Sequence, residues 1–439
     1  MSRPRTSVFP SQSKTFLHRA LRATRLSFFS LLCIGVCGDV TYGQAKPPAA
    51  QSTFVGSKQC QRCHTDLYAS WQKTRMANIV RDPRLHPEAV LGDFTHPNPL
   101  VTFGLDKVAF VYGSRYKQRY FTRIGDDYYV LPAQWDVAKK KWLPFHVPDT
   151  GSDWWTAHYP SDNMQRPTGP LCDGCHSVNY NIATKQVTEW NVGCEKCHGP
   201  GSLHVAHPTK ANIVNPQNLD PVRGNDICMQ CHTQGQPKSN PIAANSGPGG
   251  TSEAKYYDWP VGFLPGDRLA DFWTFEDHRL GETTFYHYAD GTAHKNRMQG
   301  NDFAQSVMAH REIRCFDCHN VHSDKHPSDL VDEGNDLCLG CHRGRGVPGP
   351  GIYQTLTEHT HHAANSPGSQ CTACHMPKIE QTIPGNYVAA HTFKFISPER
   401  TEQFKEPNAC NQCHTDKTPA WALQQLSTWQ SVSPWSVLQ

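Results

Sequence analysis

The chain has 439 residues, of which 37% are hydrophobic, and its 42 Lys and Arg nearly balance its 39 Asp and Glu. A net charge of +3 is too small to indicate a nucleic-acid partner or an anionic membrane surface, and the hydrophobic share is too high for a wholly disordered chain. Because 32 Gly and 33 Pro interrupt the sequence, we expect many loops and turns and few long regular elements.

Residues 1–45 have the pattern of a signal peptide. Six basic side chains precede the apolar stretch 26–36, which is too short to span a bilayer, and Gly43-Gln44-Ala45 offers a cleavage site. An uncleaved anchor is the alternative. No later stretch is long and apolar enough to be transmembrane. The sequence therefore predicts an exported protein, periplasmic or at the cell surface, without a transmembrane segment in the mature chain.

A Cys-x-x-Cys-His motif occurs eight times. Outside the expected leader, which holds Cys33 and Cys37, every cysteine belongs to one of these motifs. In order, the cysteines are Cys60 and Cys63, Cys172 and Cys175, Cys194 and Cys197, Cys228 and Cys231, Cys315 and Cys318, Cys338 and Cys341, Cys371 and Cys374, and Cys410 and Cys413. The histidines that complete the motifs are His64, His176, His198, His232, His319, His342, His375 and His414.

The motif spacing fits covalent attachment of haem. Two thiols three positions apart can add to the two vinyl groups of one porphyrin, and the following His then reaches the iron as its proximal ligand. A redox dithiol or a zinc ribbon also uses Cys-x-x-Cys, but neither needs a His after every copy. The sequence therefore predicts eight haem c groups, each with its iron, numbered here as haems 1 to 8 in chain order.

The uneven motif spacing divides the chain into segments. We expect a mainly α fold with few regular elements, a multihaem cytochrome c fold organised around packed haems, with a small antiparallel β insert near 100–146. After the signal peptide, the expected segments are the haem 1 module at 46–98, the β-rich insert at 99–160, haems 2–4 at 161–236, a flexible and aromatic connecting segment at 237–310, and haems 5–8 at 311–439.

The β insert follows from aromatic and β-branched residues between turn signals. Strands are expected at 101–103, 108–112, 116–124 and 128–131 and around the pair Trp135 and Trp142, with turns at 125–127 and 136–140. Lys117, Arg119 and Arg123 alternate with Tyr116, Gln118 and Tyr120, which indicates a solvent face and an inner face. Short helices are expected near the motifs, for instance at 66–75 and 301–311.

Each iron also needs a ligand on its second face unless that face is open for chemistry. Sixteen histidines outside the motifs and the leader are twice the number required, so supply does not decide the matter. His322 lies three residues after His319, on the same side of a helical turn, so it favours a neighbouring haem; the same argument applies to His204 after His198. The candidates for the distal position are His204, His287, His294, His310, His322, His359, His361, His362, His391 and Met76. Of His359, His361 and His362, only one or two can be ligands, and Met76 could equally be a core residue.

Two parts of the sequence are similar to known multihaem cytochromes. The stretch Gly56-Ser57-Lys58-Gln59-Cys60, with Cys63, His64, Tyr68 and Trp71, resembles the haem module of the cytochrome c-552/c-554 group, in which the position of Met76 is often His. The segments 194–204 and 371–377, the latter followed by His391, are similar to multihaem nitrite reductases, octahaem tetrathionate reductases and hydroxylamine oxidoreductases. Relatives of this kind include electron carriers and enzymes, and the reductases commonly mark an open haem by replacing the motif His with Lys, a marker that this chain lacks.

We therefore expect electron transfer along a series of haems, with other cytochromes or a quinol-linked complex as redox partners. The alternative is an octahaem oxidoreductase that acts on a small inorganic nitrogen or sulfur compound, such as nitrite, hydroxylamine or tetrathionate, at one five-coordinate haem near the β insert. A haem filament or docking subunit is a third possibility. The sequence leaves open whether the protein is an enzyme and nominates no catalytic residue.

Overall fold

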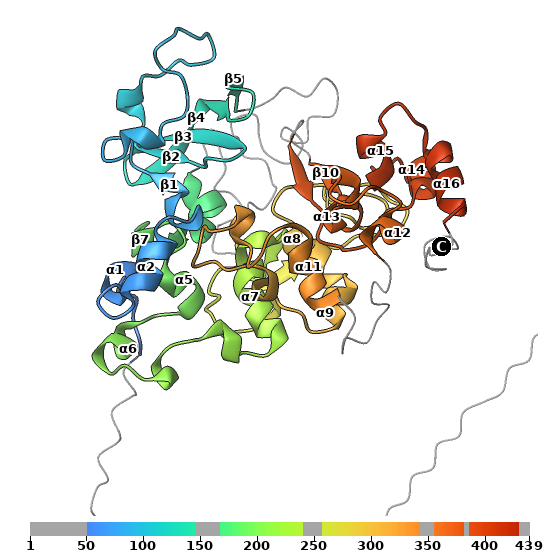
Figure 1. The fold of residues 1–439 in the computed structure, drawn as a ribbon. Helices are drawn as coiled ribbons and strands as arrows, with labels where there is room; N and C mark the ends of the chain where they lie inside the picture. The colour runs from blue at the N-terminus through green and yellow to red at the C-terminus, as the bar shows by residue number, and fades with distance from the viewer. Residues whose placement is uncertain (1–50, 146–166, 240–256, 343–354, 382–385, 430–439) are drawn as a thin grey trace, which may run out of the picture. The chain divides into compact units, whose positions relative to one another are not determined.

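Short helices that begin at or near the haem motifs are the recurring element of the fold (Figure 1). The computed structural model describes residues 51–145, 167–239, 257–342, 355–381 and 386–429, which belong to one compact unit; the expected signal peptide lies outside the described residues. The longest helices are α7 (Pro221–His232), α11 (Gly334–His342) and α16 (Pro419–Ser427). In the described residues no helix is long and apolar enough to cross a membrane.

The remaining helices are brief. They are α1 (Ser57–Cys60), α2 (Thr65–Trp71), α4 (Gly174–His176), α5 (Cys194–His198), α6 (Ser202–Ala206), α8 (Gln299–Ala304), α9 (Val307–His310), α10 (Cys315–Cys318), α12 (Leu356–Thr360), α13 (Cys371–His375), α14 (Pro398–Phe404) and α15 (Ala409–Cys413). Such short helices gain little from their own hydrogen bonds, so their stability depends on caps and packing. Asp220, for example, starts α7 by accepting hydrogen bonds from the N–H groups of Val222 and Arg223.

The β insert is an antiparallel meander of five strands. Its order is β1-β2-β3-β4-β5, with β1 (Val80–Arg81), β2 (Phe110–Tyr112), β3 (Lys117–Ile124), β4 (Asp127–Asp136) and β5 (Lys141–Pro144). The expected antiparallel insert is thus present, with two differences. Residues 101–103 form no strand, because Phe103 packs its ring against Tyr120 and Trp142, and the expected strand at 128–131 continues through Trp135 as β4.

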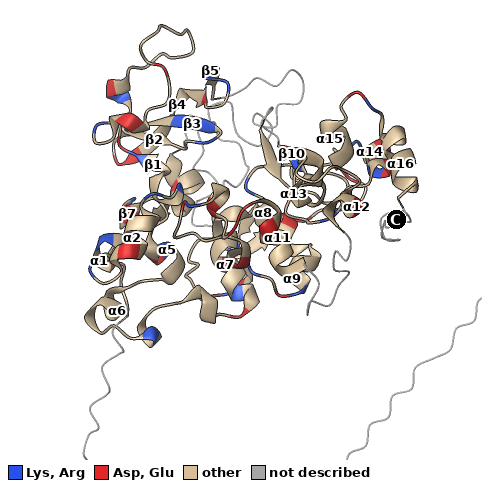
Figure 2. Ribbon diagram, viewed as in Figure 1, with Lys and Arg blue, Asp and Glu red and all other residues tan. Residues whose placement is uncertain are grey.

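Both faces of this sheet are covered, which corrects the expected solvent face of β3. Successive side chains of a strand point to opposite faces, and the buried rings of Tyr120 and Phe121 accordingly belong to two different hydrophobic clusters. The basic residues of β3 make it the blue strand of Figure 2. Two of them nevertheless have partners in the fold: Lys117 pairs with the buried Asp136 at 2.5 Å, and Arg119 lies over the ring of Phe145. Only Arg123, near the end of the strand, has the expected exposure.

The two helices expected near the motifs are shorter than predicted. The first, expected at 66–75, ends at Trp71 as α2. The second, expected at 301–311, is interrupted where the hydroxyl of Ser306 accepts a hydrogen bond from the N–H of Ala309 and starts α9 anew. Because the side chain of Ser306 caps α9, the backbone at this residue does not continue α8, and the expected single helix is divided in two.

The aromatic connecting segment forms part of the fold rather than a free linker. Three small two-stranded sheets accompany the motifs, namely β6 (Ser177–Val178) with β7 (Glu189–Trp190), β8 (Gly235–Pro237) with β9 (Trp273–Phe275), and β10 (Lys378–Glu380) with β11 (Tyr387–Ala389). Through β8 and β9, Trp273 joins Met229 of motif 4, Phe263 and Leu269 in one hydrophobic cluster. Residues 263–275 thus pack against motif 4, and residues 240–256, which include most of the stretch expected to be flexible, lie outside the described residues.

Candidate haem sites

The sixteen motif cysteines all lie in the described residues, and none forms a disulfide. Their motifs occupy single helical turns, so the two thiols and the imidazole of each motif lie on one side of that turn. Cys175, Cys231 and Asp173 show how densely the neighbouring motifs pack: the thiol of Cys231 lies 4.0 Å from the carbonyl oxygen of Cys175, and Asp173 is 2% exposed. Because none of the sixteen thiols forms a disulfide, all of them are available for thioether bonds.

Five motif histidines face a second histidine. Their ring centres are 6.1–6.5 Å apart, and four of the five pairs are nearly parallel, with interplanar angles of 13–20°. The pairs are His64 with His204, His198 with His322, His319 with His391, His375 with His359, and His414 with His362. Each joins a motif His to a residue from the candidate distal set.

This separation matches two ligands of one iron. Imidazoles bound from opposite faces, with metal–nitrogen bonds of about 2.0–2.1 Å and about 1.1 Å from nitrogen to ring centre, have ring centres roughly 6.3 Å apart. Rings in direct stacking contact would be closer, as in the 4.2 Å pair of His361 and Trp429. The five pairs thus leave the space that a porphyrin iron needs, and the residues present fit the cofactor.

Backbone carbonyls orient several of these rings. The Nδ1 of His204 donates to the carbonyl of Thr209 at 3.0 Å, and that of His391 donates to Ala389 at 2.9 Å. His198, His319 and His362 make the same kind of bond to Val214, Ser328 and Thr360, at 2.6–3.0 Å. A hydrogen bond at Nδ1 leaves Nε2 as the ligating atom and fixes the ring, as is usual for metal-bound histidine.

The other distal candidates are not brought opposite a motif imidazole in the described residues. His361 stacks on Trp429, His287 packs against His278 with ring centres 5.1 Å apart, and His294 packs against Tyr288. His310 donates from Nδ1 to the carbonyl of Ser306, so its Nε2 is free to ligate. Met76 lies in a single turn of 3-10 helix after α2, where its carbonyl accepts from the N–H of Val192.

Motif 2 has a different surrounding from the five paired motifs. Its His176 is half-buried, its Nδ1 is buried without a hydrogen-bond partner, and the Tyr112 ring lies 5.6 Å away at 60°. Burial, followed by the charges of Arg297 and Arg119, lowers the pKa of His176 to about 4. The side chain of Lys196 reaches the carbonyl of Gly174 in the same motif. Haem 2 would therefore have several basic side chains nearby, together with the acids Asp173 and Asp258.

Glu195, inside motif 3, links the sites of haems 1 and 3, and sequence reasoning missed it. Its carboxylate is 1% exposed and accepts hydrogen bonds from the backbone N–H groups of Val55, Gly56 and Gly201, the last two at 2.7 Å. Gly201 directly precedes α6, which carries His204 to His64. Nothing in a Cys-Glu-Lys-Cys-His motif distinguishes this acid from an exposed one.

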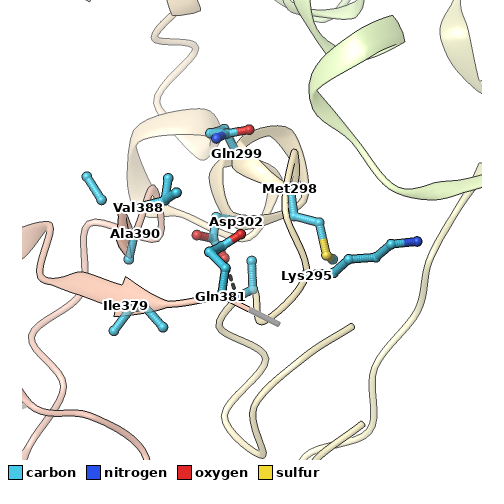
Figure 3. A pocket seen from close by; sticks show the side chains of 10 residues that line it. Lys295, Met298, Gln299, Asp302, Ile379, Gln381, Val388 and Ala390 are labelled. Atoms are coloured by element: carbon cyan, nitrogen blue, oxygen red, sulfur yellow. Dashed lines mark hydrogen bonds between the residues drawn. The ribbon is translucent and has the colours of Figure 1, made fainter. Parts of the chain in front are cut away.

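A small cavity of about 10 Å³, room for about one water molecule, lies where α8 meets β10 and β11 (Figure 3). Asp302 lines it and accepts hydrogen bonds from the N–H groups of Ala293 and His391, and burial raises the pKa of Asp302 to about 7. Gln299, three residues earlier, bonds the imidazole of His232 through Oε1. One short helix therefore contacts both the motif 4 imidazole and the backbone of the histidine opposite His319.

The motifs, the free thiols and the imidazole pairs define a multihaem c-type cytochrome. Residues 308–346, which contain motifs 5 and 6, match the protein-family model described as a doubled CXXCH motif. No curated protein matches the chain.

Solved structures show the same kind of fold. The structure of the outer cell wall cytochrome OcwA is similar with a TM-score of 0.66 at 21% identity, covering 86% of this chain and 87% of that one. Weaker likenesses are to an undecahaem cytochrome from the S-layer of Carboxydothermus ferrireducens (TM-score 0.44, 19% identity, 86% of this chain and 62% of that one) and the octahaem sulfite reductase MccA of Wolinella succinogenes (0.41, 15%, 79% and 59%). The chain thus has the fold of a multihaem cytochrome.

Proposed function

We propose that the chain is an exported octahaem c-type cytochrome that transfers electrons along a series of covalently held haems. The proposal rests chiefly on the way in which cysteines of different motifs meet. The side chains of Cys60 and Cys194 lie next to each other, as do those of Cys228 and Cys315, and helices α1 and α5, like α7 and α10, are in contact. Because each thiol carries one edge of a porphyrin, such contacts bring the haems of the two motifs close together.

The remaining motifs continue this series. Cys338 of motif 6 lies next to Cys371 of motif 7, and the thiols of Cys318 and Cys341 lie close enough for their charges to interact. Helices α5 and α7 pack together, as do α13 and α15. The contacts support the order haem 1, 3, 4, 5, 6, 7, 8, with haem 2 joined to haem 4 through Cys175.

The proposed ligands follow from the same geometry. The sixteen motif cysteines hold the porphyrins, the eight motif histidines are the proximal ligands, and His204, His322, His391, His359 and His362 are the distal ligands of haems 1, 3, 5, 7 and 8. When bound, each haem supplies one reversible electron at its iron. The protein orients the rings and keeps water from the iron, and two histidine ligands leave no free position for a substrate.

The likeness to OcwA, an outer cell wall cytochrome, supports the cell surface as the location over the periplasm. Redox partners would be other cytochromes or a quinol-linked complex, which exchange electrons at exposed haem edges. The side chains of Cys63 in motif 1, Cys341 in motif 6 and Cys413 in motif 8 are exposed, so both ends and one inner position of the proposed series are accessible.

A second candidate is reduction of a small anion, such as nitrite, at haem 2. The observation that favours it is the cluster of Arg119, Arg297 and Lys196 around His176, because positive charge at a buried iron attracts anions. Tyr112 stands beside the same imidazole and donates its hydroxyl to Asp173.

One preparation tests both functions. The full chain, expressed with a c-haem maturation system, should carry eight haems by intact mass and pyridine haemochrome assay, and dithionite should reduce all of them. Electron paramagnetic resonance is then recorded with and without nitrite, hydroxylamine or cyanide. Fewer than eight haems would refute the octahaem proposal. A high-spin ferric signal that these small molecules remove would exclude the pure carrier in favour of the second candidate.

A further inference from the structure

The same hydrogen bond recurs at three places between motifs. In each case the residue three positions before the first cysteine of one motif accepts a hydrogen bond from the N–H of the first cysteine of a later motif. Ser57 Oγ accepts from Cys194, Asn225 Oδ1 from Cys315, and Asn335 Oδ1 from Cys371, each at 2.8 Å. The three bonds link motifs 1 to 3, 4 to 5 and 6 to 7.

The two asparagines make a second bond in the same register. Asn225 donates from Nδ2 to the carbonyl of Ile313 at 3.2 Å, and Asn335 donates to Ser369 at 2.9 Å. Ile313 and Ser369 each precede the first cysteine of their motif by two residues. Both asparagines thus hold the next motif at two points. Ser57, which has no amide, instead donates its hydroxyl to Glu189 at 2.5 Å.

The bond matters because of where the acceptor comes from. Cys194, Cys315 and Cys371 are the first residues of α5, α10 and α13, and the first N–H groups of a helix have no partner inside it. A residue just before the helix ordinarily supplies that partner. Here the partner comes from another haem motif, so the cap fixes the later helix on the earlier one. Each of these helices has only four or five residues, so the cap adds to a small number of hydrogen bonds within the helix.

The clamped motifs are also those whose first cysteines touch. Cys60 lies next to Cys194, Cys228 next to Cys315, and Cys338 next to Cys371, each pair close enough to shift the pKa of the two thiols. Among the first cysteines of the motifs, the backbone hydrogen bonds and the side-chain contacts therefore select the same three pairs, whereas the contact of Cys175 with Cys231 joins motifs 2 and 4 without a clamp.

We propose that Ser57, Asn225 and Asn335 are positioning residues that fix the approach of two haem-bearing cysteines, and that they divide the haem series into three closely coupled pairs, 1–3, 4–5 and 6–7. This inference rests on the proposed function, because it concerns how neighbouring haems are coupled in the electron path. It assigns the coupling within each pair to a single side chain, that of Ser57, Asn225 or Asn335.

The test uses the full haem-loaded protein and the variant N335A. Adjacent haems whose transitions couple give a paired positive and negative band in circular dichroism at the Soret wavelength. N335A should retain the wild-type haem count and lose about one third of the band amplitude, since one of three clamped pairs is released. N335D, which keeps the acceptor oxygen, should retain most of the amplitude.

Asn408 provides the matched control. It lies two residues before Cys410 and caps α15 of its own motif by accepting from the N–H of Asn411, with no bond to another motif. N408A should leave the band amplitude unchanged. An unchanged amplitude in N335A, or an equal loss in N408A, would overturn the proposal.

Peptide mass spectrometry decides the case in which N335A binds fewer haems. The clamp predicts that the loss falls on the clamped partner, so the peptide with Cys371 and Cys374 should lack haem while the peptide with Cys338 and Cys341 keeps it. Loss at any other motif contradicts the proposal. The haem count and dithionite reduction of the wild-type protein test the proposed function separately, so the two failures are distinguishable.

Discussion

Replacing Glu195 by Gln should destabilise the haem 1 region by about 3 kcal/mol. The carboxylate accepts from three backbone N–H groups, at Val55, Gly56 and Gly201, and it is 1% exposed. Hydrogen bonds to charged groups contribute about 1.5–3 kcal/mol each, and a buried donor left without a partner costs about 1–3 kcal/mol. Glutamine keeps one acceptor oxygen, so its NH₂ group must face either Gly56 or Gly201, and at least one of the three bonds is lost.

Urea unfolding of the haem-loaded protein, followed at the Soret band, measures this cost, and electron paramagnetic resonance locates it. Because Gly201 leads into the helix of His204, E195Q should also produce a high-spin signal from haem 1. Glu333 is the control, since its side chain is 65% exposed and bonds only His326 at the surface. E333Q should change the free energy of unfolding by less than about 0.5 kcal/mol. Equal stabilities for E195Q and the wild type would refute the role of Glu195.

Three further predictions concern other parts of the molecule. H322A should open the iron of haem 3 and give a high-spin ferric signal in electron paramagnetic resonance, whereas H361A, which removes a ring stacked on Trp429, should give none. D136N should lower the free energy of urea unfolding by about 3 kcal/mol, because Lys117 is left buried without its ion pair, while the haem count by mass stays at the wild-type value. E406Q should flatten the pH dependence of stability between about pH 4.5 and 7, measured by urea unfolding at pH 5 and pH 8.

The sign for Glu406 follows from its surroundings. Its side chain is 1% exposed and neither oxygen has a hydrogen-bond partner; burial and Asp290 raise its pKa to about 7, against the opposing charges of Lys394 and Arg400. The folded protein therefore binds the Glu406 proton more tightly than the unfolded chain does. Its contribution to stability falls as the pH rises from 4.5 to 7, by up to about 3 kcal/mol. At pH 8, E406Q should be more stable than the wild type, and at pH 5 the two should be nearly equal. The same difference at both pH values would contradict this reasoning.

The haem motifs and the β insert could be predicted from sequence because each depends on local spacing. Two cysteines and a histidine within five residues are enough to define an attachment site, whatever the rest of the chain does. The strands around Tyr120 and Trp135 follow from residue type and turn signals. The second buried face of the sheet could not be predicted, since Phe121 is covered there by residues distant in sequence, among them Val80, Phe145 and Trp190.

The pairing of motif histidines with distal histidines could be predicted from the sequence only in part. In the structure His322 and His204 face the imidazoles of motifs other than the ones they follow, His198 and His64, and their ligation of those haems stays a prediction. For His361 no choice was possible from the sequence, because it is adjacent to His362 and the direction of each ring depends on where α12 ends. In the structure His361 has a left-handed backbone conformation, φ 54°, and turns its ring to Trp429.

One signal for the clamps was present in the sequence. Gly-Asn-Asp precedes an aliphatic residue and the first cysteine in both motif 4 and motif 6, as Gly224-Asn225-Asp226 and Gly334-Asn335-Asp336. A repeat of this kind, outside the attachment motif, indicates a shared contact. Motif 1 has Gly56-Ser57 in the same register, so the partner could be recognised only in three dimensions.

Interlocking of segments explains how a chain with small hydrophobic clusters can hold one structure. The imidazoles of motifs 1, 3 and 5 face histidines from later parts of the chain, namely His204, His322 and His391. The imidazoles of motifs 7 and 8 instead face His359 and His362, which precede those motifs in the chain. The clamps run the same way, from an earlier motif to a later helix. Each proposed haem thus cross-links two distant segments through its iron and its thioethers. The coordination of haem 1 is complete only when α6 has packed on motif 3, and that of haem 5 only when the segment after motif 7 has reached α8.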